Sequence, residues 1–158
     1  MAELQIETRG LDELIARMKH FPAKMKEVSK IGMSASLLVL WENVPPYPSA
    51  NPDSSYRRTG TLGRTLGSSE TGGKSAGSPD IYTTKNLGTT GMEGHFGTKL
   101  DYAPYVIGEN QAWMHKDRWW KLSAIIPKAQ GKIVKIWEGI AKLLADFLDA
   151  KSSGLLGK

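Results

Sequence analysis

Residues 56–67 read YRRTGTLGRTLG and lie between a proline-rich run and a glycine-rich run. The pair Thr59-Gly60 predicts a turn, because glycine adopts positive φ without a steric cost. After this turn, leucines and an arginine alternate with small residues, which predicts a strand over Leu62–Ser69 with one packed face. The three arginines of the stretch could hold a phosphate group, or they could hold a neighbouring subunit.

The segments on either side predict loops and strands. Residues 44–56 are rich in proline, which fixes φ and disfavours helix before it, so we expect a flexible, extended surface loop. Residues 70–79 are rich in glycine and serine and predict a second flexible loop. Short strands near Asp80–Lys85 and Met92–Lys99 then complete an antiparallel meander.

Helices are predicted at both ends of the chain. The apolar spacing over 11–21 predicts a short amphipathic helix that stops near Pro22, and a second helix follows from Ala23 to about Asn43. The strongest periodic signal lies between Pro127 and Ala150 and predicts a long amphipathic helix. Before the first helix, polar and apolar residues alternate over 3–9, which predicts a short half-buried strand.

These elements predict an α+β fold. We expect an antiparallel sheet of about four strands, packed against two or three helices, with the long amphipathic helix at the C-terminus. The length of 158 residues fits one domain, which we place at residues 1–151, followed by a disordered tail at 152–158.

Two apolar segments are candidates for a subunit or partner interface. The helix end Leu37–Trp41 is apolar on every side and must be covered, either by its own domain or by another chain. The aromatic segment Tyr102–Trp120 is the second candidate, because tryptophan and tyrosine are common at interfaces. The interface residues expected from these segments are Leu37, Leu40, Trp41, Trp113, Trp119 and Trp120.

Composition excludes several classes of protein. With 40% hydrophobic and 23% charged residues, the chain is expected to be globular. It has no cysteine, which excludes a disulfide framework, a thiolate metal site and a cysteine nucleophile. No run is long and apolar enough for a membrane span, and the N-terminus lacks the features of a secretory signal. We therefore expect a soluble protein that stays in the cytoplasm until it assembles.

No arrangement of residues predicts catalysis or a cofactor. The run Gly67–Ser75 misses the phosphate-loop spacing by one residue, and the following prolyl turn cannot open a helix. The three histidines, His20, His95 and His115, lack metal-ligand spacing. We expect no enzyme, no metal and no cofactor.

Nonspecific DNA binding is the alternative from a different class. Arg57, Arg58 and Arg64 could contact phosphates, as could the lysine-rich side of the C-terminal helix. The lysines on that side are Lys128, Lys132, Lys135 and Lys142. No recognition helix or other readout motif accompanies them, and a solvated helix face is the more common meaning of such a pattern.

Two segments together resemble the neck proteins of tailed bacteriophages, described as head–tail joining, tail completion or minor tail proteins. Residues 56–66 are similar to the family's Thr-Gly-x-Leu signature, and residues 96–106 are similar to its segment with a Gly-Thr followed by Tyr-Ala-x-Tyr-Val. The chain departs from the family at 107–110, where Ile-Gly-Glu-Asn replaces the frequent Glu-Phe-Gly-Thr. The positions that match are Arg57, Arg58, Thr59, Gly60, Leu62, Arg64, Tyr102, Ala103, Tyr105 and Val106.

The resemblance implies a structural protein that forms a homo-oligomeric ring, a hexamer, at the head–tail junction of the virion. Its implied partners are the portal or head-completion (adaptor) protein on one side and the tail terminator or tail tube protein on the other. Double-stranded DNA would pass through the lumen, and no membrane is involved. The tail terminator itself, a ring that caps the tail tube, is the near alternative.

Overall fold

The computed structural model describes residues 11–46, 48, 60–68, 78–86 and 92–149. The strand predicted over 3–9, the tail over 152–158 and most of the two predicted loops lie outside these residues. The helices are α1 (Leu11–Glu42), α2 (Thr61–Leu66), α3 (Ala103–Ile107) and α4 (Ile125–Asp149), and the strands are β1 (Ile81–Asn86) and β2 (Met92–Gly97). Two 3-10 turns, Trp113–His115 and Leu122–Ala124, connect α3 to α4.

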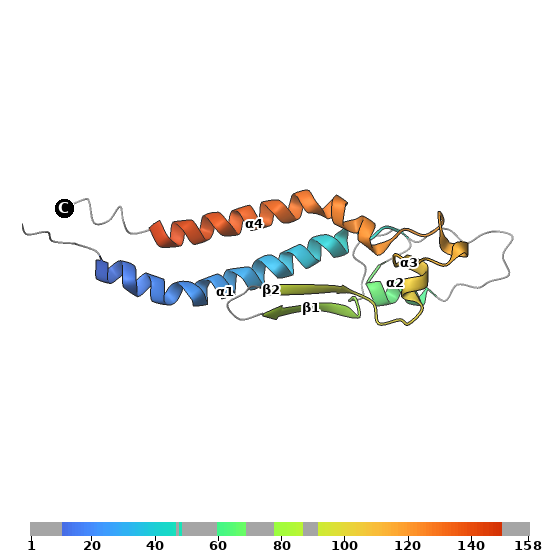
Figure 1. Cartoon of the computed structure of the whole chain (residues 1–158), viewed down its shortest axis with the longest axis horizontal. Helices are drawn as coiled ribbons and strands as arrows, with labels where there is room; N and C mark the ends of the chain where they lie inside the picture. The colour runs from blue at the N-terminus through green and yellow to red at the C-terminus, as the bar shows by residue number, and fades with distance from the viewer. Residues whose placement is uncertain (1–10, 47, 49–59, 69–77, 87–91, 150–158) are drawn as a thin grey trace, which may run out of the picture.

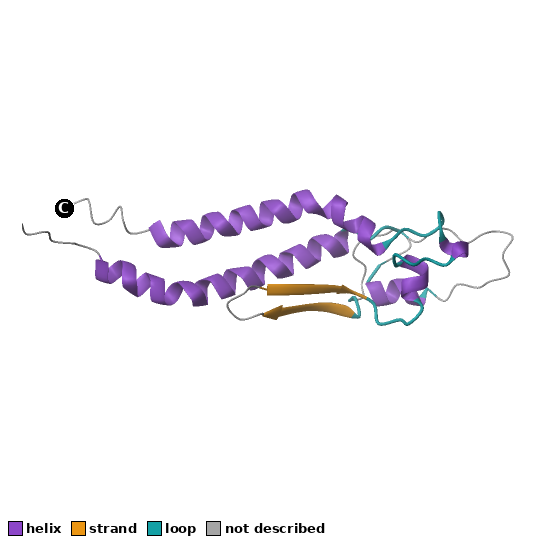
Figure 2. Cartoon of the chain, viewed as in Figure 1, coloured by secondary structure: helices purple, strands orange, loops and turns teal. Residues whose placement is uncertain are grey.

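The described residues form three layers and an end lobe. Helix α4 lies along one side of α1, and the hairpin of β1 and β2 lies along the other side (Figure 1). The short helices α2 and α3 form the end lobe beyond the C-terminal end of α1, together with the loops that lead to α4 (Figures 1 and 2). This arrangement of helices and an antiparallel hairpin is an α+β fold.

Helix α1 is continuous, so the prediction of a helix that stops near Pro22 is wrong. Pro22 lies inside α1 and its side chain is exposed to solvent. A proline inside a helix costs about 3 kcal/mol, because it removes one backbone hydrogen bond and crowds the preceding turn. The buried residues Val28, Leu37 and Val39 further along the helix provide the compensating contacts. Figure 1 shows α1 bent in its first half, as expected for a helix that accommodates a proline.

The long C-terminal helix is confirmed, and it begins two residues earlier than predicted, at Ile125. It approaches α1 closely at Gly32, where an added Cβ would lie 2.1 Å from Cδ1 of Ile140. Nearby, the indole N–H of Trp137 donates a 3.1 Å hydrogen bond to the hydroxyl of Ser36. In α4, only Ile125 and Ala129 are buried. Beyond its first turn the helix therefore packs mainly against α1 and leaves much of its apolar surface exposed.

The two later strands of the predicted meander are confirmed as β1 and β2, although β2 ends at Gly97 instead of near Lys99. They pair antiparallel, with Thr84 opposite Gly94. An added Cβ at Gly94 would lie 2.6 Å from Sδ of Met33, so this glycine lets the hairpin approach α1. In the described residues the sheet has two strands, compared with the four that were predicted.

The strand predicted over Leu62–Ser69 is wrong, because residues 61–66 form helix α2. Gly60 and Gly67 both have positive φ, 65° and 63°, and they end the helix on either side. Leu62 and Leu66 lie one helical turn apart, so a single turn of helix buries both on one face. The same two leucines also fit one face of a strand, which is why the sequence pattern predicted a strand.

Within the described residues, α1 and α4 are the long helices, and neither is apolar enough to cross a membrane.

Candidate assembly site

The two segments that carry the family resemblance pack against each other in the end lobe. Leu62 and Leu66 come from α2, and Ala103, Val106 and Ile107 come from α3; together they form one buried cluster. Leu100, Trp119, Trp120 and Leu122 are partly buried against this cluster. The apolar members of both segments thus point inward, toward one another.

Arg64 and Tyr105 point the other way and stay at the surface. Arg64 is exposed, and its guanidinium lies 3.3 Å from the hydroxyl of Thr61 on the same helix. Tyr105 is 60% exposed, and Tyr102 at the start of α3 is 45% exposed. The remaining matched positions, Arg57, Arg58 and Thr59, lie outside the described residues.

A chain of hydroxyl groups joins α2 to the end of β2. Thr98 donates a 2.8 Å hydrogen bond to the hydroxyl of Thr65, which in turn donates 2.9 Å to the carbonyl of Leu62. Thr98 also accepts a 3.2 Å hydrogen bond from the backbone N–H of Leu100. The carboxylate of Asp80 accepts from the backbone N–H of Lys99 at 3.3 Å. The Gly-Thr of the second segment therefore has a specific role, because its threonine fixes the distance between the strand and α2.

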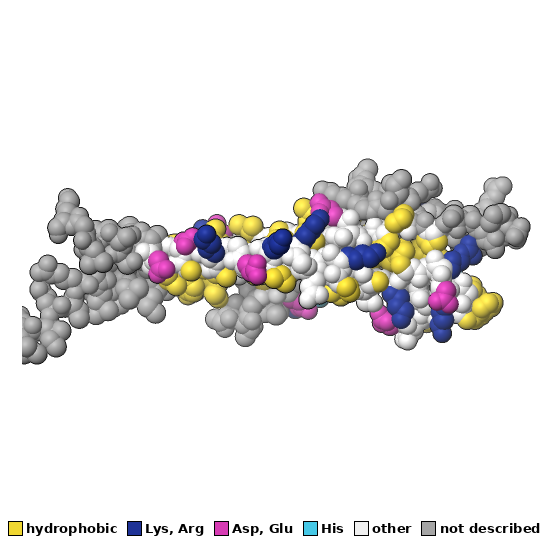
Figure 3. Space-filling model, turned by 90° about the horizontal axis from the view of Figure 1, so that it is seen from above, with side chains coloured by type: hydrophobic (Ala, Val, Ile, Leu, Met, Phe, Trp, Pro, Cys, Tyr) yellow, Lys and Arg dark blue, Asp and Glu magenta, His cyan; other side chains and the backbone are white. Residues whose placement is uncertain are grey.

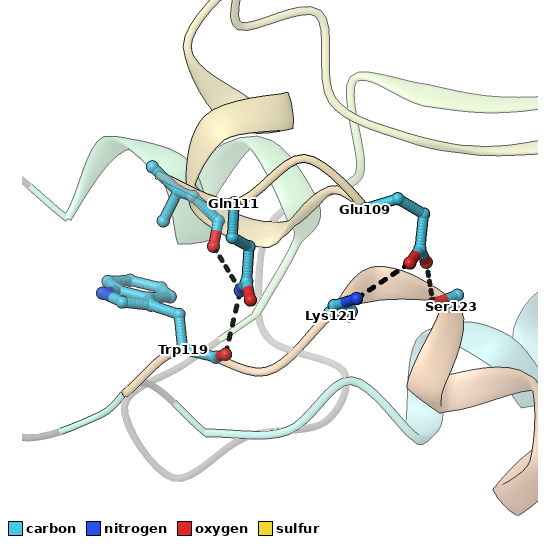
Figure 4. A network of polar contacts seen from close by, with 6 residues as sticks. Glu109, Gln111, Trp119, Lys121 and Ser123 are labelled. Atoms are coloured by element: carbon cyan, nitrogen blue, oxygen red, sulfur yellow. Dashed lines mark hydrogen bonds and ion pairs between the residues drawn. The ribbon is translucent and has the colours of Figure 1, made fainter. Parts of the chain in front are cut away.

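Gln111 holds the loop between α3 and α4 in place. Its side-chain amide is buried and donates to two backbone carbonyls, that of Val106 at 2.7 Å and that of Trp119 at 2.9 Å (Figure 4). Both protons of the amide are used, which is the favourable arrangement for a buried amide group. Gln111 thereby holds Trp119 against the buried cluster of the end lobe.

A second polar group lies on the surface of the same loop. The carboxylate of Glu109 accepts hydrogen bonds from the hydroxyl of Ser123 and from the Lys121 ammonium, the latter at 3.0 Å (Figure 4). These bonds lower the pKa of Glu109 below its usual value, with Ser123 the larger cause and Lys121 the next. The group ties the loop after α3 to the turn that precedes α4.

The interface residues predicted from α1 are covered by the chain itself. Leu37 is 2% exposed and Trp41 is 7% exposed, while Leu40 is partly buried. The ring of Trp41 contacts Tyr82 of β1 edge-on, with ring centres 5.5 Å apart. Of the two alternatives for this helix end, the structure has burial within its own domain. Trp41 therefore connects the layers of one chain, and little of it is available to another subunit.

The aromatic residues of the loop after α3 divide into two groups. Trp119 and Trp120 are partly buried against the end-lobe cluster, and the indole N–H of Trp120 donates a 3.1 Å hydrogen bond to the carbonyl of Pro46. Trp113, by contrast, is 82% exposed, and the adjacent Met114 is also exposed. The backbone N–H of Ala112 donates 2.8 Å to the carbonyl of Tyr105, which places the turn that carries Trp113 beside α3.

We call the exposed group Tyr102, Tyr105, Trp113 and Met114 the tip. Its members are held from beneath by the buried cluster and by Gln111, so they are presented on a fixed support. An exposed tryptophan and two exposed tyrosines on such a support are typical of a protein-binding surface. The sequence pointed to Tyr102, Tyr105 and Trp113 but not to Gln111, because a single glutamine in a loop has no distinguishing pattern.

In the part of the chain that the structure describes, no cluster of histidine and carboxylate side chains could hold a metal ion. His95 lies on β2 and His115 lies on the 3-10 turn after α3, so the structure does not assemble them into one site.

Comparison of the chain with models of protein families, with curated proteins and with solved structures finds no match. The family resemblance therefore depends on the two segments and on how they are arranged in space.

Proposed function

We propose that this chain is a structural, non-catalytic subunit of a ring at the head–tail junction of a tailed bacteriophage. In this role it joins the portal or head-completion complex to the tail, and the genome passes through the ring. The observation that carries the proposal is the packing of the two neck-protein segments into one cluster. Leu62 and Val106, from separate segments, are both buried in it.

This packing supports the proposal because it gives one physical reason for both segments. A pair of short motifs that resemble a family by chance has no reason to meet in space. Here the apolar positions of each motif contact those of the other, and the outward positions Arg64 and Tyr105 lie on the surface that the cluster supports. A rigid support beneath exposed aromatic residues is what a subunit of a permanent assembly requires.

The surface of α4 is compatible with a lumen through which DNA moves. Lys128, Lys132 and Lys135 are exposed, and none has an ion-pair partner among the described residues. Glu138 and Asp146 follow on the same helix, so the charge is mixed along it (Figure 3). Weak and interrupted positive charge lets a duplex pass, since many phosphate contacts would hold it.

The proposal is tested with particles from a phage genome that encodes this chain, with and without an early stop codon in its gene. Loss of the chain is expected to leave filled heads and separate tails of normal length, and mass spectrometry of intact particles is expected to detect the protein. Tails of uncontrolled length would assign the chain to the tail terminator, because a missing cap lets the tube grow. Intact infectious particles without the chain would overturn both assignments.

Nonspecific DNA binding is the second candidate, and the exposed lysines of α4 are the observation that favours it. It predicts a duplex affinity that falls steeply with salt and that weakens in a Lys128→Ala, Lys132→Ala, Lys135→Ala triple variant. A chain that binds duplex DNA tightly at physiological salt as a monomer would favour this candidate over the ring subunit.

A further inference from the structure

Two apolar surfaces are exposed among the described residues. The first is the tip. The second lies on α4, where Val134 is 45% exposed and Ala141 and Ala145 are also exposed. We call these three residues the α4 flank. They follow one another at nearly whole numbers of helical turns, so they share one side of the helix.

The α4 flank is separate from the side of α4 that packs on α1. Ile140 and Trp137 point toward Gly32 and Ser36 of α1. The α4 flank lies roughly a quarter turn around the helix from them, on the way to the charged side. Seen from the α4 side of the molecule, hydrophobic side chains border the row of lysines and carboxylates (Figure 3).

We propose that the tip of one copy docks on the α4 flank of the next copy. This inference rests on the proposed ring, and it names the two surfaces that meet. A ring requires two different surfaces of one chain to contact each other, since a contact between identical surfaces closes into a pair. The tip and the α4 flank are two such surfaces, because they lie on different elements and both are exposed.

The size of the tip fits this contact. If a whole aromatic side chain offers ~150–250 Å², the exposed fractions of Trp113, Tyr105 and Tyr102 amount to roughly 300–450 Å². The largest apolar patch of an ordinary monomer is ~300–600 Å² and is often functional, and each side of a standard interface contributes about 800 Å². The tip can therefore form the core of one interface, with polar residues around it.

The charges around the tip favour the α4 flank, and not a second tip, as the surface that the tip contacts. The exposed cations Lys116 and Arg118 lie next to the tip, with Asp117 between them. In a contact between two tips these cations would face their own copies, and like charges repel. On α4, the exposed carboxylate of Glu138 is the charged group nearest the flank, between Val134 and Ala141, whereas Lys135 and Lys142 lie farther around the helix. A contact of tip with flank therefore covers both surfaces and can place Glu138 opposite Lys116 or Arg118.

The absence of cysteine from the chain permits a direct test by cross-linking. Full-length chains with Tyr105→Cys are mixed with chains carrying Ala141→Cys, and a short bis-maleimide is added. The expected product is a dimer that joins residue 105 to residue 141. Gly139→Cys is the matched control, because it lies on the charged side of the same helix with nothing within 4 Å of an added Cβ. Dimers that join 105 to 105, or 141 to 141, would overturn the proposed contact.

A mixing experiment by analytical ultracentrifugation tests the same contact without a cross-linker. Trp113→Asp disables the tip and Val134→Asp disables the α4 flank. Each variant alone is expected to self-associate about 10- to 100-fold more weakly than wild type, as for interface hot spots. An equimolar mixture is expected to form a 1:1 dimer that grows no further, because one intact tip and one intact flank remain. Gly139→Asp is expected to associate like wild type.

A wild-type chain that remains monomeric up to ~1 mM, weaker than the usual range for specific contacts, would overturn the proposed contact. So would a mixture of the two variants that forms no dimer. Failure of the contact between tip and flank can be distinguished from failure of the proposed neck function. Cross-links between 105 and 141 in a protein that is absent from phage particles would retain the contact and reject the neck role. If the protein is present in particles but cross-links form only between identical positions, the neck role is retained and the contact is rejected.

Discussion

The indole nitrogen of Trp41 donates a 2.7 Å hydrogen bond to the backbone carbonyl of Gly67. Trp41 lies near the end of α1, and Gly67 directly follows α2, so this bond joins the three layers to the end lobe. The two residues also fit sterically, because a Cβ on Gly67 would lie 2.8 Å from the indole nitrogen. This contact and the hydrogen bond from Thr98 to Thr65 therefore both fix the position of the lobe relative to the layers.

Replacing Trp41 by phenylalanine is expected to destabilise the protein by about 2–3 kcal/mol, because it leaves the buried carbonyl of Gly67 without its donor and removes packed atoms. Urea denaturation measures the change. Trp113→Phe is the control at an exposed tryptophan, where a change within about 0.5 kcal/mol is expected. Equal losses in the two variants would show that the bond to Gly67 has no particular role.

Gly67→Ala is expected to destabilise the chain by more than about 1 kcal/mol, because alanine disfavours the φ of 63° and its methyl group would collide with the ring of Trp41. Gly131→Ala makes the same chemical change within α4, where an added Cβ meets nothing within 4 Å. There alanine is expected to stabilise by up to about 1 kcal/mol. Thermal unfolding of both variants gives the comparison. A Gly67→Ala variant as stable as wild type would contradict the close packing of Gly67 on Trp41.

Gln111→Leu is expected to cost about 2 kcal/mol or more, because it removes the donors of two carbonyls, those of Val106 and Trp119. Gln130→Leu provides the control, since Gln130 is exposed on α4. Limited proteolysis of the loop between α3 and α4 should detect the loss directly, because only the Gln111 variant is expected to be cut faster there. Equal rates of cleavage would show that the amide does not hold the loop.

Tyr82 makes the stability of the fold depend on pH in the alkaline range. Burial, and then the nearby carboxylate of Glu42, raise the pKa of Tyr82 above its usual value. Tyr82 therefore ionises at lower pH in the unfolded chain than in the folded chain. The contribution of its neutral hydroxyl to the unfolding free energy is complete below the usual pKa of about 10, and it is lost as the pH rises through the pKa of the folded chain.

Between pH 9 and pH 11, the unfolding free energy of wild type is therefore expected to fall more than that of Tyr82→Phe. Phenylalanine keeps a ring against Trp41 without the titrating group. Glu42→Gln should lower the pKa of Tyr82 part of the way back, which an absorbance titration can follow. Parallel pH profiles of wild type and Tyr82→Phe would refute the assignment.

Much of the fold was predictable where the sequence has a long period or a clear turn. The apolar repeat that includes Ile133, Ile140 and Phe147 gave α4 within two residues at its start, and alternation between turns gave the β-hairpin. One error came from Pro22, which did not end its helix, and the other came from a short segment. Two leucines four apart fit one turn of helix as well as a strand, and only the backbone at Gly60 and Gly67 distinguishes them.

The candidate site was predictable as an aromatic segment, but the exposure of its individual rings was not. The density of rings favours an interface, but it does not separate the exposed Tyr105 and Trp113 from the partly buried Trp119. The burial of Trp41 was left open, because periodicity does not say which chain covers an apolar helix end. Gln111 and Thr98 were missed because their roles are hydrogen bonds to distant backbone and side-chain atoms, which leave no local pattern.

Gly32 and Gly94 bring both outer layers close to the same level of α1. Gly32 admits Ile140 of α4 on one side of α1, and Gly94 admits Met33 of α1 on the other, so these two close approaches occur one residue apart along α1. We expect this level of α1 to open last when the three layers separate. Hydrogen exchange is therefore expected to be slowest around residues 32–37 and to quicken toward both ends of α1.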